Sequence, residues 1–220
     1  MREAVKRLRV VAEPERDCRR CPRLVEYRDA NRSIEPEWFN GAVPSFGSHA
    51  SRLLIVGLAP GRGGANRTGR PFTGDYAGDL LYQTLTDFEF ARGTYGARID
   101  DGFKLVDCMV TNAVRCAPPE NKPTTAEIKE CRPFLMARIQ ELPKLRVILA
   151  LGRIAHDQVL AAHGLKKSSF VFGHAHRHEL PAGTILFDSY HCSRYNTNTG
   201  RLTAQMFEAV FKDIRAELAR

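Results

Sequence analysis

Residues 52–82 read RLLIVGLAPGRGGANRTGRPFTGDYAGDLLY, and this stretch decides the fold. It begins with an apolar run, residues 53–56, which is typical of a strand buried on both faces. A glycine-rich loop follows, and helical periodicity resumes only near Asp75. Because glycine lets the backbone approach a ligand closely, the order of strand, glycine loop and helix predicts a binding site in the loop.

Two common classes of glycine loop do not fit this stretch. A phosphate-binding P-loop needs a lysine followed by serine or threonine at the start of the helix, and the stretch has no such pair. A dinucleotide-binding loop needs glycines spaced as G-x-G-x-x-G, and the glycines at 57, 61, 63 and 64 do not have that spacing. The loop therefore predicts another kind of ligand, with Gly57, Ala59, Gly61 and Phe72 beside it.

Composition sets the broad class of the protein. A chain of 220 residues can form one domain with a full core. Its net charge of +8 favours a polyanionic partner such as nucleic acid, although solubility alone also explains it. Charges spread through the first residues predict neither a signal peptide nor a membrane anchor, so we expect a cytoplasmic protein. In that reducing compartment, six cysteines predict metal ligation or buried thiols rather than disulfides. Separately, we expect a monomer.

Strands alternate with helices along the chain, which predicts an α/β fold with a parallel sheet covered on both faces. Strands are expected at residues 53–56, 103–110, 146–151 and 184–187. Helices are expected at residues 1–13, up to 31, 75–88, 124–142, 153–163 and 201–219. Ligands bind beyond the carboxyl ends of parallel strands. The residues at those ends are the loop 57–61, Asn112, Gly152 and His191.

Four cysteines have a spacing that suits a metal centre. Cys18 and Cys21 form a C-x2-C pair, and Cys116 and Cys131 follow after a long gap. Structural zinc usually takes two closely spaced pairs, whereas the second pair here is widely spaced, which favours a [4Fe-4S] cluster over zinc. Residues 1–32 would then supply two ligands to a single domain over residues 1–220. The remaining cysteines, Cys108 and Cys192, are interpreted as a packed thiol and a small loop residue.

Taken in order, these motifs resemble the type-5 uracil-DNA glycosylases, an iron-sulfur family. The matching motifs are C-x2-C at 18–21, GLAPG at 57–61, GRPFTGDYAG at 69–78, TNAVRC at 111–116, Cys131 and HCS at 191–193. The resemblance covers nearly the whole chain. It implies a three-layer α/β/α fold with a four-stranded parallel sheet and a structural cluster. It also implies hydrolysis of the N-glycosidic bond of uracil and other deaminated bases in DNA.

Three residues then acquire roles at an extruded base. Phe72 would stack on the base, although an aromatic near a helix start can also be core. Asn112 would bind uracil O4 and N3–H through its amide, although it can also be a turn residue. His191 would donate a hydrogen bond to uracil O2 and stabilise the departing anion, although a histidine after a strand can also be structural.

The water-activating carboxylate is a separate question. The related family 4 has a glutamate where this chain has Leu58, and classical uracil glycosylases have an aspartate where it has Ala59. Asp75 is the candidate here, with helix capping as its alternative role. Gly61 stands where the classical enzymes have a tyrosine that excludes the thymine methyl group, which predicts a roomier pocket. Residues expected to contact DNA phosphates are Ser193, Arg194 and Arg201.

Two other functions remain open at this point. The first is a basic iron-sulfur protein that binds nucleic acid and senses redox state without catalysis. The second is a nucleotide hydrolase that uses the glycine loop, which the missing lysine disfavours. A second metal site at His174, His176 and His178 is not favoured, because the pattern positions no acidic neighbour to complete it.

Overall fold

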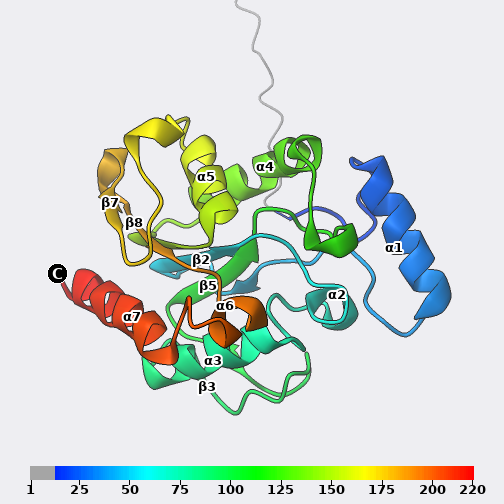
Figure 1. The fold of residues 1–220 in the computed structure, drawn as a ribbon, viewed down its shortest axis with the longest axis horizontal. Coiled ribbons are helices and arrows are strands. Elements are labelled where there is room, and N and C mark those ends of the chain that lie inside the picture. Colours follow the sequence, from blue (N-terminus) through cyan, green and yellow to red (C-terminus); the bar gives the residue numbers. More distant parts are fainter. Residues whose placement is uncertain (1–12) are drawn as a thin grey trace, which may run out of the picture.

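The computed structural model describes residues 13–220, so the helix expected over residues 1–13 lies outside the described part except for its last residue. A six-stranded sheet runs through the middle of the molecule in the order β1-β5-β2-β6-β8-β7 (Figure 1). Its strands are β1 (Phe46–Gly47), β2 (Leu53–Gly57), β5 (Cys108–Asn112), β6 (Val147–Leu151), β7 (Arg177–Glu179) and β8 (Ile185–Ser189).

The central strands confirm the expected parallel sheet. β5, β2, β6 and β8 are parallel, and every one of their residues is buried. Burial on both faces is the reason that these strands read as continuous apolar runs. The outer strands β1 and β7 pair antiparallel at the two edges. They are two and three residues long, too short to show a periodicity in the sequence.

The strand expected over residues 103–110 is wrong as one element. Asp107 has a φ of 54°, a left-handed conformation that breaks the strand and that aspartate tolerates better than most residues. The part before it, β4 (Lys104–Leu105), pairs with β3 (Ala91–Arg92) in a separate two-stranded ribbon. The part after it is β5, which extends two residues further than expected, to Asn112.

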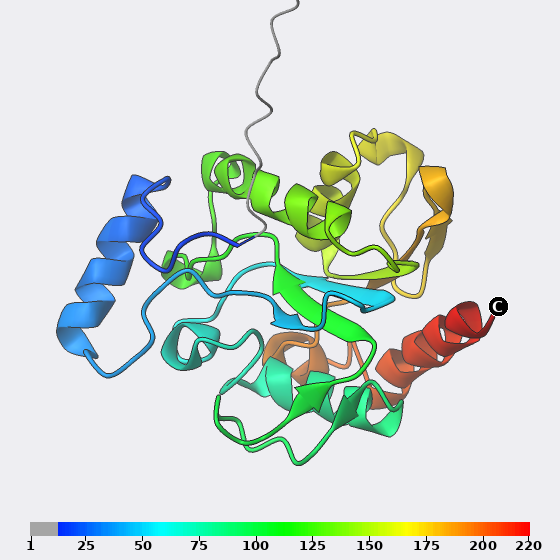
Figure 2. The ribbon, with the colours of Figure 1, turned by 180° about the vertical axis from the view of Figure 1, so that it is seen from behind.

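Helices cover both faces of the sheet, as Figures 1 and 2 show from opposite sides. α4 and α5 lie on one face, and α3 and α7 lie on the other. In both views α1 and α7 stand at opposite ends of the molecule. The helices are α1 (Pro22–Ile34), α2 (Ala65–Thr68), α3 (Tyr76–Asp87), α4 (Thr125–Gln140), α5 (Arg153–Ala162), α6 (Arg194–Asn198) and α7 (Ala204–Ala219), with 3-10 turns at Pro119–Asn121, Lys167–Ser169 and Pro181–Gly183.

The core follows the alternation of side chains along the strands. In β2, Leu53 and Ile55 face α3 and α7, whereas Leu54 and Val56 face α4 and α5. The sheet therefore has two apolar faces, each closed by a pair of helices. The start of α4 also agrees with the sequence, because the Thr124 capping box is present there, whereas α7 begins three residues later than expected, at Ala204. No helix among residues 13–220 is both long and apolar enough to cross a membrane.

Candidate functional site

A pocket of about 700 Å³ opens at the carboxyl ends of the parallel strands. The pocket therefore lies where the strand ends predicted a ligand site, and its volume suits a small ligand. Eight of the residues singled out in the sequence line it: Ala59, Gly61, Phe72, Asp75, Asn112, His191, Ser193 and Arg194. Gly57 lies behind this lining, and Arg201 is outside it.

Gly57 and Asn112 are register partners at the ends of β2 and β5. A β-carbon on Gly57 would lie 2.4 Å from Oδ1 of Asn112 and 2.5 Å from the tip of the Phe72 ring. Only glycine at this position therefore lets both side chains meet at the strand end. Asn112 is 3% exposed, and its Oδ1 has no hydrogen-bond partner among the described residues. A buried acceptor without a partner, at the wall of a pocket, indicates a ligand that donates to it.

The Phe72 ring forms part of both the core and the pocket wall. It is 6% exposed and packs in the same cluster as the α3 and α7 side chains, yet it also lines the cavity. Its backbone has a φ of 51°, which is uncommon for a residue with a bulky side chain. The ring lies nearly parallel to that of His191, with centroids 5.8 Å apart. Phe72 is therefore a core side chain that also borders the pocket, where a base could stack on it.

His191 is half-buried at the pocket wall, after the end of β8. Burial lowers its pKa to about 4, so the imidazole is neutral at physiological pH. Its main-chain carbonyl accepts a hydrogen bond from the Asn196 side chain at 2.8 Å, which ties it to α6. A neutral ring in this position can donate one hydrogen bond without bringing a charge into the pocket.

Asp75 caps α3 and faces the pocket at the same time. Its Oδ1 accepts a hydrogen bond from the Gly78 amide at 3.1 Å, as an N-cap residue does. Its Oδ2 lies against the glycine loop, 3.2 Å from where a β-carbon on Gly61 would stand. Burial raises the pKa of Asp75. Among the described residues that line the pocket, it is the only carboxylate.

Arginine side chains lie over aromatic rings both at the pocket wall and outside it. The Arg194 guanidinium lies over the ring of Tyr76 at 5.4 Å, and that of Arg201 lies over Tyr190 at 4.6 Å. Ser193 caps the short helix α6 through its hydroxyl, which accepts from the Asn196 amide. Arginine over an exposed ring is a surface that suits phosphates and bases.

Two further pocket residues were not found from the sequence. Asn121 comes from the turn before α4, where it has a φ of 58°, and its proline-rich surroundings indicate only a turn. Arg62 lines the pocket from the glycine loop and lies over Trp38 at 5.0 Å. It also donates a hydrogen bond to Asn31 at 2.6 Å. An arginine in a glycine-rich loop was the available signal for it.

The four predicted cysteine ligands line one small cavity, away from the pocket. Cys18 and Cys21 come from the chain before α1, Cys116 follows β5, and Cys131 lies in α4. The Cys131 sulfur accepts a hydrogen bond from the Arg115 amide at 3.3 Å, which suits a thiolate ligand. The chemistry of this donor set therefore fits a four-thiolate centre.

The spacing of the sulfurs bears on the kind of centre. Among the described residues, the one group of three or more His, Cys, Asp or Glu ligand atoms within 4.8 Å of one another is His156, His178 and Asp188. No three cysteine sulfurs thus lie that close together. One zinc ion with bonds of about 2.3 Å would bring its sulfurs nearer than that. Thiolates that bind separate irons of a cluster stand further apart, so the spacing fits a cluster better.

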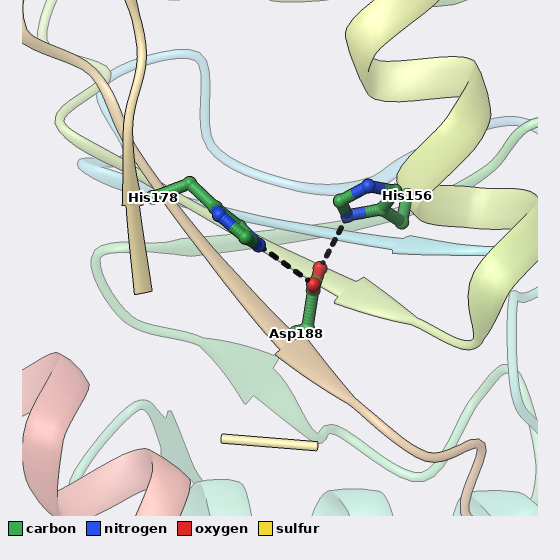
Figure 3. Close-up of side chains that lie close together, drawn as sticks. All are labelled: His156, His178 and Asp188. Carbon is green, nitrogen blue, oxygen red and sulfur yellow. Dashed lines mark hydrogen bonds and ion pairs between the residues drawn. The ribbon is translucent and has the colours of Figure 1, made fainter. Parts of the chain in front are cut away.

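The three alternating histidines do not share a site. His174 packs on Tyr190, and His176 bonds to the Val171 carbonyl. His178 instead joins the group in Figure 3, where its Nε2 donates to Asp188 at 2.9 Å and His156 Nδ1 donates to the other oxygen at 2.7 Å.

The group in Figure 3 is a hydrogen-bonded ion pair. His156 also donates from Nε2 to the Phe170 carbonyl at 2.9 Å. Both nitrogens of its ring therefore carry protons, and neither has a lone pair for a metal.

Comparison with known proteins identifies the family. Residues 44–215 match the family model of the uracil DNA glycosylase superfamily. The type-5 uracil-DNA glycosylase of Thermus thermophilus is 45% identical over 90% of this chain and 92% of its own length. The type-5 enzyme of Mycobacterium leprae is 41% identical over 90% of each chain. The chain belongs to the type-5 uracil-DNA glycosylase family.

A more distant relative is the type-4 uracil-DNA glycosylase of Pyrobaculum aerophilum, which is 34% identical over 68% of this chain and 62% of its own length. The type-5 relatives thus match more of the chain at higher identity. Membership of this family confirms the resemblance drawn from the motifs. In this type-5 chain the pocket wall after β2 carries Leu58 and Ala59, neither of which has a carboxylate.

Proposed function

We propose that this protein is a DNA-repair glycosylase, which takes an extruded uracil base into the pocket and hydrolyses its N-glycosidic bond, leaving an abasic site. The observation that carries the proposal is the unpartnered Oδ1 of Asn112 at the wall of a pocket that also holds Phe72. An extruded base needs both a stacking surface and a polar reader of its edge. The names of the type-5 relatives support the same activity.

Recognition of the base follows from these two side chains. The Phe72 ring offers an apolar face inside the pocket, on which a flat base can stack. Oδ1 of Asn112 accepts from uracil N3–H, and its amide nitrogen donates to O4. Cytosine has no proton on N3 and carries a donor at position 4, so it matches neither group of Asn112 in this orientation of the amide. In that orientation the pocket favours uracil over the base from which uracil forms.

Bond cleavage places positive charge on the sugar and negative charge on the departing base. The electron pair of the glycosidic bond goes to uracil N1, and the charge spreads onto O2. His191, neutral because of its low pKa, donates a hydrogen bond to O2 and stabilises that anion. A water molecule adds to the sugar carbon, and its proton passes to a protein side chain that acts as the general base.

We propose Asp75 as the general base that accepts the proton of the attacking water. It is the one carboxylate among the described pocket residues, and its raised pKa makes it a stronger proton acceptor than an ordinary aspartate. Its ionised form also stabilises the positive charge on the sugar. The capping bond to Gly78 uses Oδ1, which leaves Oδ2 directed at the glycine loop for this role.

Cys18, Cys21, Cys116 and Cys131 would hold a [4Fe-4S] cluster. Its contribution would be structural, because the cysteine cavity lies apart from the pocket and joins the chain before α1 to α4. We regard the whole chain as one domain, with residues 1–32 supplying two of the ligands. Cysteine thiols stay reduced in a reducing compartment and can then bind metal, which supports a place in the cytoplasm.

The pocket accepts more than uracil. Gly61 adds no side chain to the wall, so a base larger than uracil meets less obstruction there. We therefore include other deaminated bases, such as hypoxanthine, among the substrates. A panel of duplexes, each with one deaminated base, tests this point, and strict preference for uracil would contradict it.

The DNA-binding face surrounds the pocket mouth, where Ser193, Arg194 and Arg201 contact DNA phosphates. One protein monomer binds one duplex. The test of the function is release of free uracil from uracil-containing DNA by the purified protein, with the visible spectrum of the same sample recorded. Free uracil with brown colour supports both activity and cluster. DNA binding without base release would instead support the non-catalytic iron-sulfur protein.

A further inference from the structure

Arg70 is a buried charge enclosed by aromatic rings. It is 3% exposed, and its guanidinium forms two parallel bonds to the Asp101 carboxylate, at 2.8 and 2.7 Å. These bonds hold the pKa of Asp101 far below its usual range. Four rings surround the guanidinium carbon at 5.1 to 5.9 Å: Phe46, Tyr82, Tyr95 and Phe103. We call Arg70, Asp101 and these four rings the arginine cage.

The arginine cage is bonded to the turn that carries Phe72. Arg70 Nε donates to the Thr73 hydroxyl at 2.8 Å. The Tyr95 hydroxyl donates to the Phe72 carbonyl and accepts from the Gly74 amide, both at 3.3 Å. The Tyr82 hydroxyl donates to the carbonyl of Pro71. Side chains of the cage therefore bond to every residue from 71 to 74.

These bonds account for an unusual backbone. The left-handed φ of Phe72 is unfavourable for a residue with a β-carbon, and such a conformation persists only where its surroundings fix it. The Phe72 carbonyl also lies against α3, 1.8 Å from where a β-carbon on Gly78 would stand. The turn is thus held from the cage on one side and from the helix on the other.

We propose that Arg70 and Tyr95 are positioning residues, which hold the turn over residues 71–74 in the conformation that places the Phe72 ring on the extruded base. This inference rests on the proposed function. Neither residue lines the pocket, so each acts on the base through the turn that carries Phe72.

Tyr95→Phe is the sharpest test, because it removes the hydroxyl and keeps the ring in the cage. Hydrogen exchange should become faster at the Gly74 amide, which loses its acceptor, with no change in the middle of α5. Tyr27→Phe, in α1 and outside the pocket, is the matched control. Unchanged exchange at Gly74 would overturn the claim that Tyr95 holds the turn, whether or not the protein cleaves DNA.

The catalytic part of the inference is tested by a double-mutant cycle. Tyr95→Phe should slow single-turnover uracil release by about tenfold, since misplacement by 1 Å can cost about 100-fold. Its affinity for undamaged duplex should stay within about twofold of the wild type. In a Phe72→Ala background the same change should have no further effect on the rate, because the ring it positions is gone.

Each outcome decides a different claim. Independent, multiplicative losses from Tyr95→Phe and Phe72→Ala would show that Tyr95 does not act through Phe72. Arg70→Lys keeps the positive charge but loses the two parallel hydrogen bonds to Asp101. It should slow uracil release in the wild-type background and should slow it less in the Phe72→Ala background. A wild type that releases no uracil would overturn the proposed function, while the exchange measurement would still decide whether the cage holds the turn.

Discussion

Oδ2 of Asp75 lies only 2.3 Å from the point where a β-carbon on Gly64 would stand. The loop at residue 64 therefore has room for the carboxylate only because it has no side chain. The neighbouring glycine is different, since a β-carbon on Gly63 would meet nothing within 4 Å. Two adjacent glycines thus differ in whether they restrict the position of the proposed base.

Gly64→Ala should displace the Asp75 carboxylate and slow single-turnover uracil release by about tenfold or more, as expected when a general base is moved. Gly63→Ala should leave the rate within about twofold of the wild type, because its methyl group has open space and neither position requires a positive φ. Equal rates for the two variants would remove Asp75 from the mechanism that we propose.

The pH dependence of uracil release should report Asp75. The base works when ionised, and burial raises its pKa. The rate should therefore fall as the pH decreases, and the midpoint of this fall should lie above about 4, the usual pKa of an aspartate. Asp75→Asn should lower the plateau rate at least about tenfold and abolish this fall. A fall that persists unchanged in the asparagine variant would assign it to another group.

The ion pair of Figure 3 should make stability depend on pH. Burial alone would lower the pKa of His156, but its bonds to Asp188 and Phe170 outweigh burial and the net shift is upward. The stabilisation from this raised pKa is fully present below the unfolded value of about 6.5 and is lost as the pH rises through the folded value.

His156→Gln should lower the free energy of unfolding by on the order of 3 kcal/mol at pH 6, because it leaves the Asp188 carboxylate buried with one partner fewer. Denaturant titrations across pH should show the difference from the wild type shrinking as the pH rises above 6.5. His163→Gln is the control, because the His163 ring bonds to the Val159 carbonyl in the preceding helix turn. A constant difference between wild type and His156→Gln would mean that the ring is neutral.

The sequence predicted the frame of the site because that frame lies at strand ends. Buried parallel strands are continuous apolar runs, so the positions of Gly57 and Asn112 could be read directly. Asp75 was predicted with helix capping and water activation as its two candidate roles, and the capping bond is present, since the capping pattern is local. Asn121 reaches the pocket by tertiary packing and left no comparable pattern, whereas Arg62 had only its place in the glycine loop as a signal.

The arginine cage shows the same limit. Arg70 lies 31 residues from Asp101, and the rings around it come from β1, α3 and the segments flanking β3 and β4. No periodicity links these residues, because the charge is buried by contacts between distant segments. The left-handed break at Asp107, which divided the expected strand, has an equally short sequence signal.

Replacing a cysteine of the proposed centre should remove the metal. Cys21→Ser should reduce the iron content from about four per chain towards zero, with loss of the brown colour, because a four-thiolate cluster loses one of its ligands. Cys108→Ala, buried in β5 away from the cysteine cavity, should keep its iron. A colourless wild type with one zinc per chain would instead establish a zinc site.

The DNA-binding face should be visible in the salt dependence of binding. Each phosphate that an arginine neutralises contributes about 0.9 to the slope of log affinity against log salt concentration. Arg194→Ala combined with Arg201→Ala should therefore make the slope shallower by about 1.8 for duplex DNA. Arg177→Ala is the matched control, because its guanidinium is paired with Glu217 at the edge strand β7. That variant should keep the wild-type slope. If all three proteins gave the same slope, the phosphates would have to lie on another face, and the arginines at the pocket mouth would serve only to pack on Tyr76 and Tyr190.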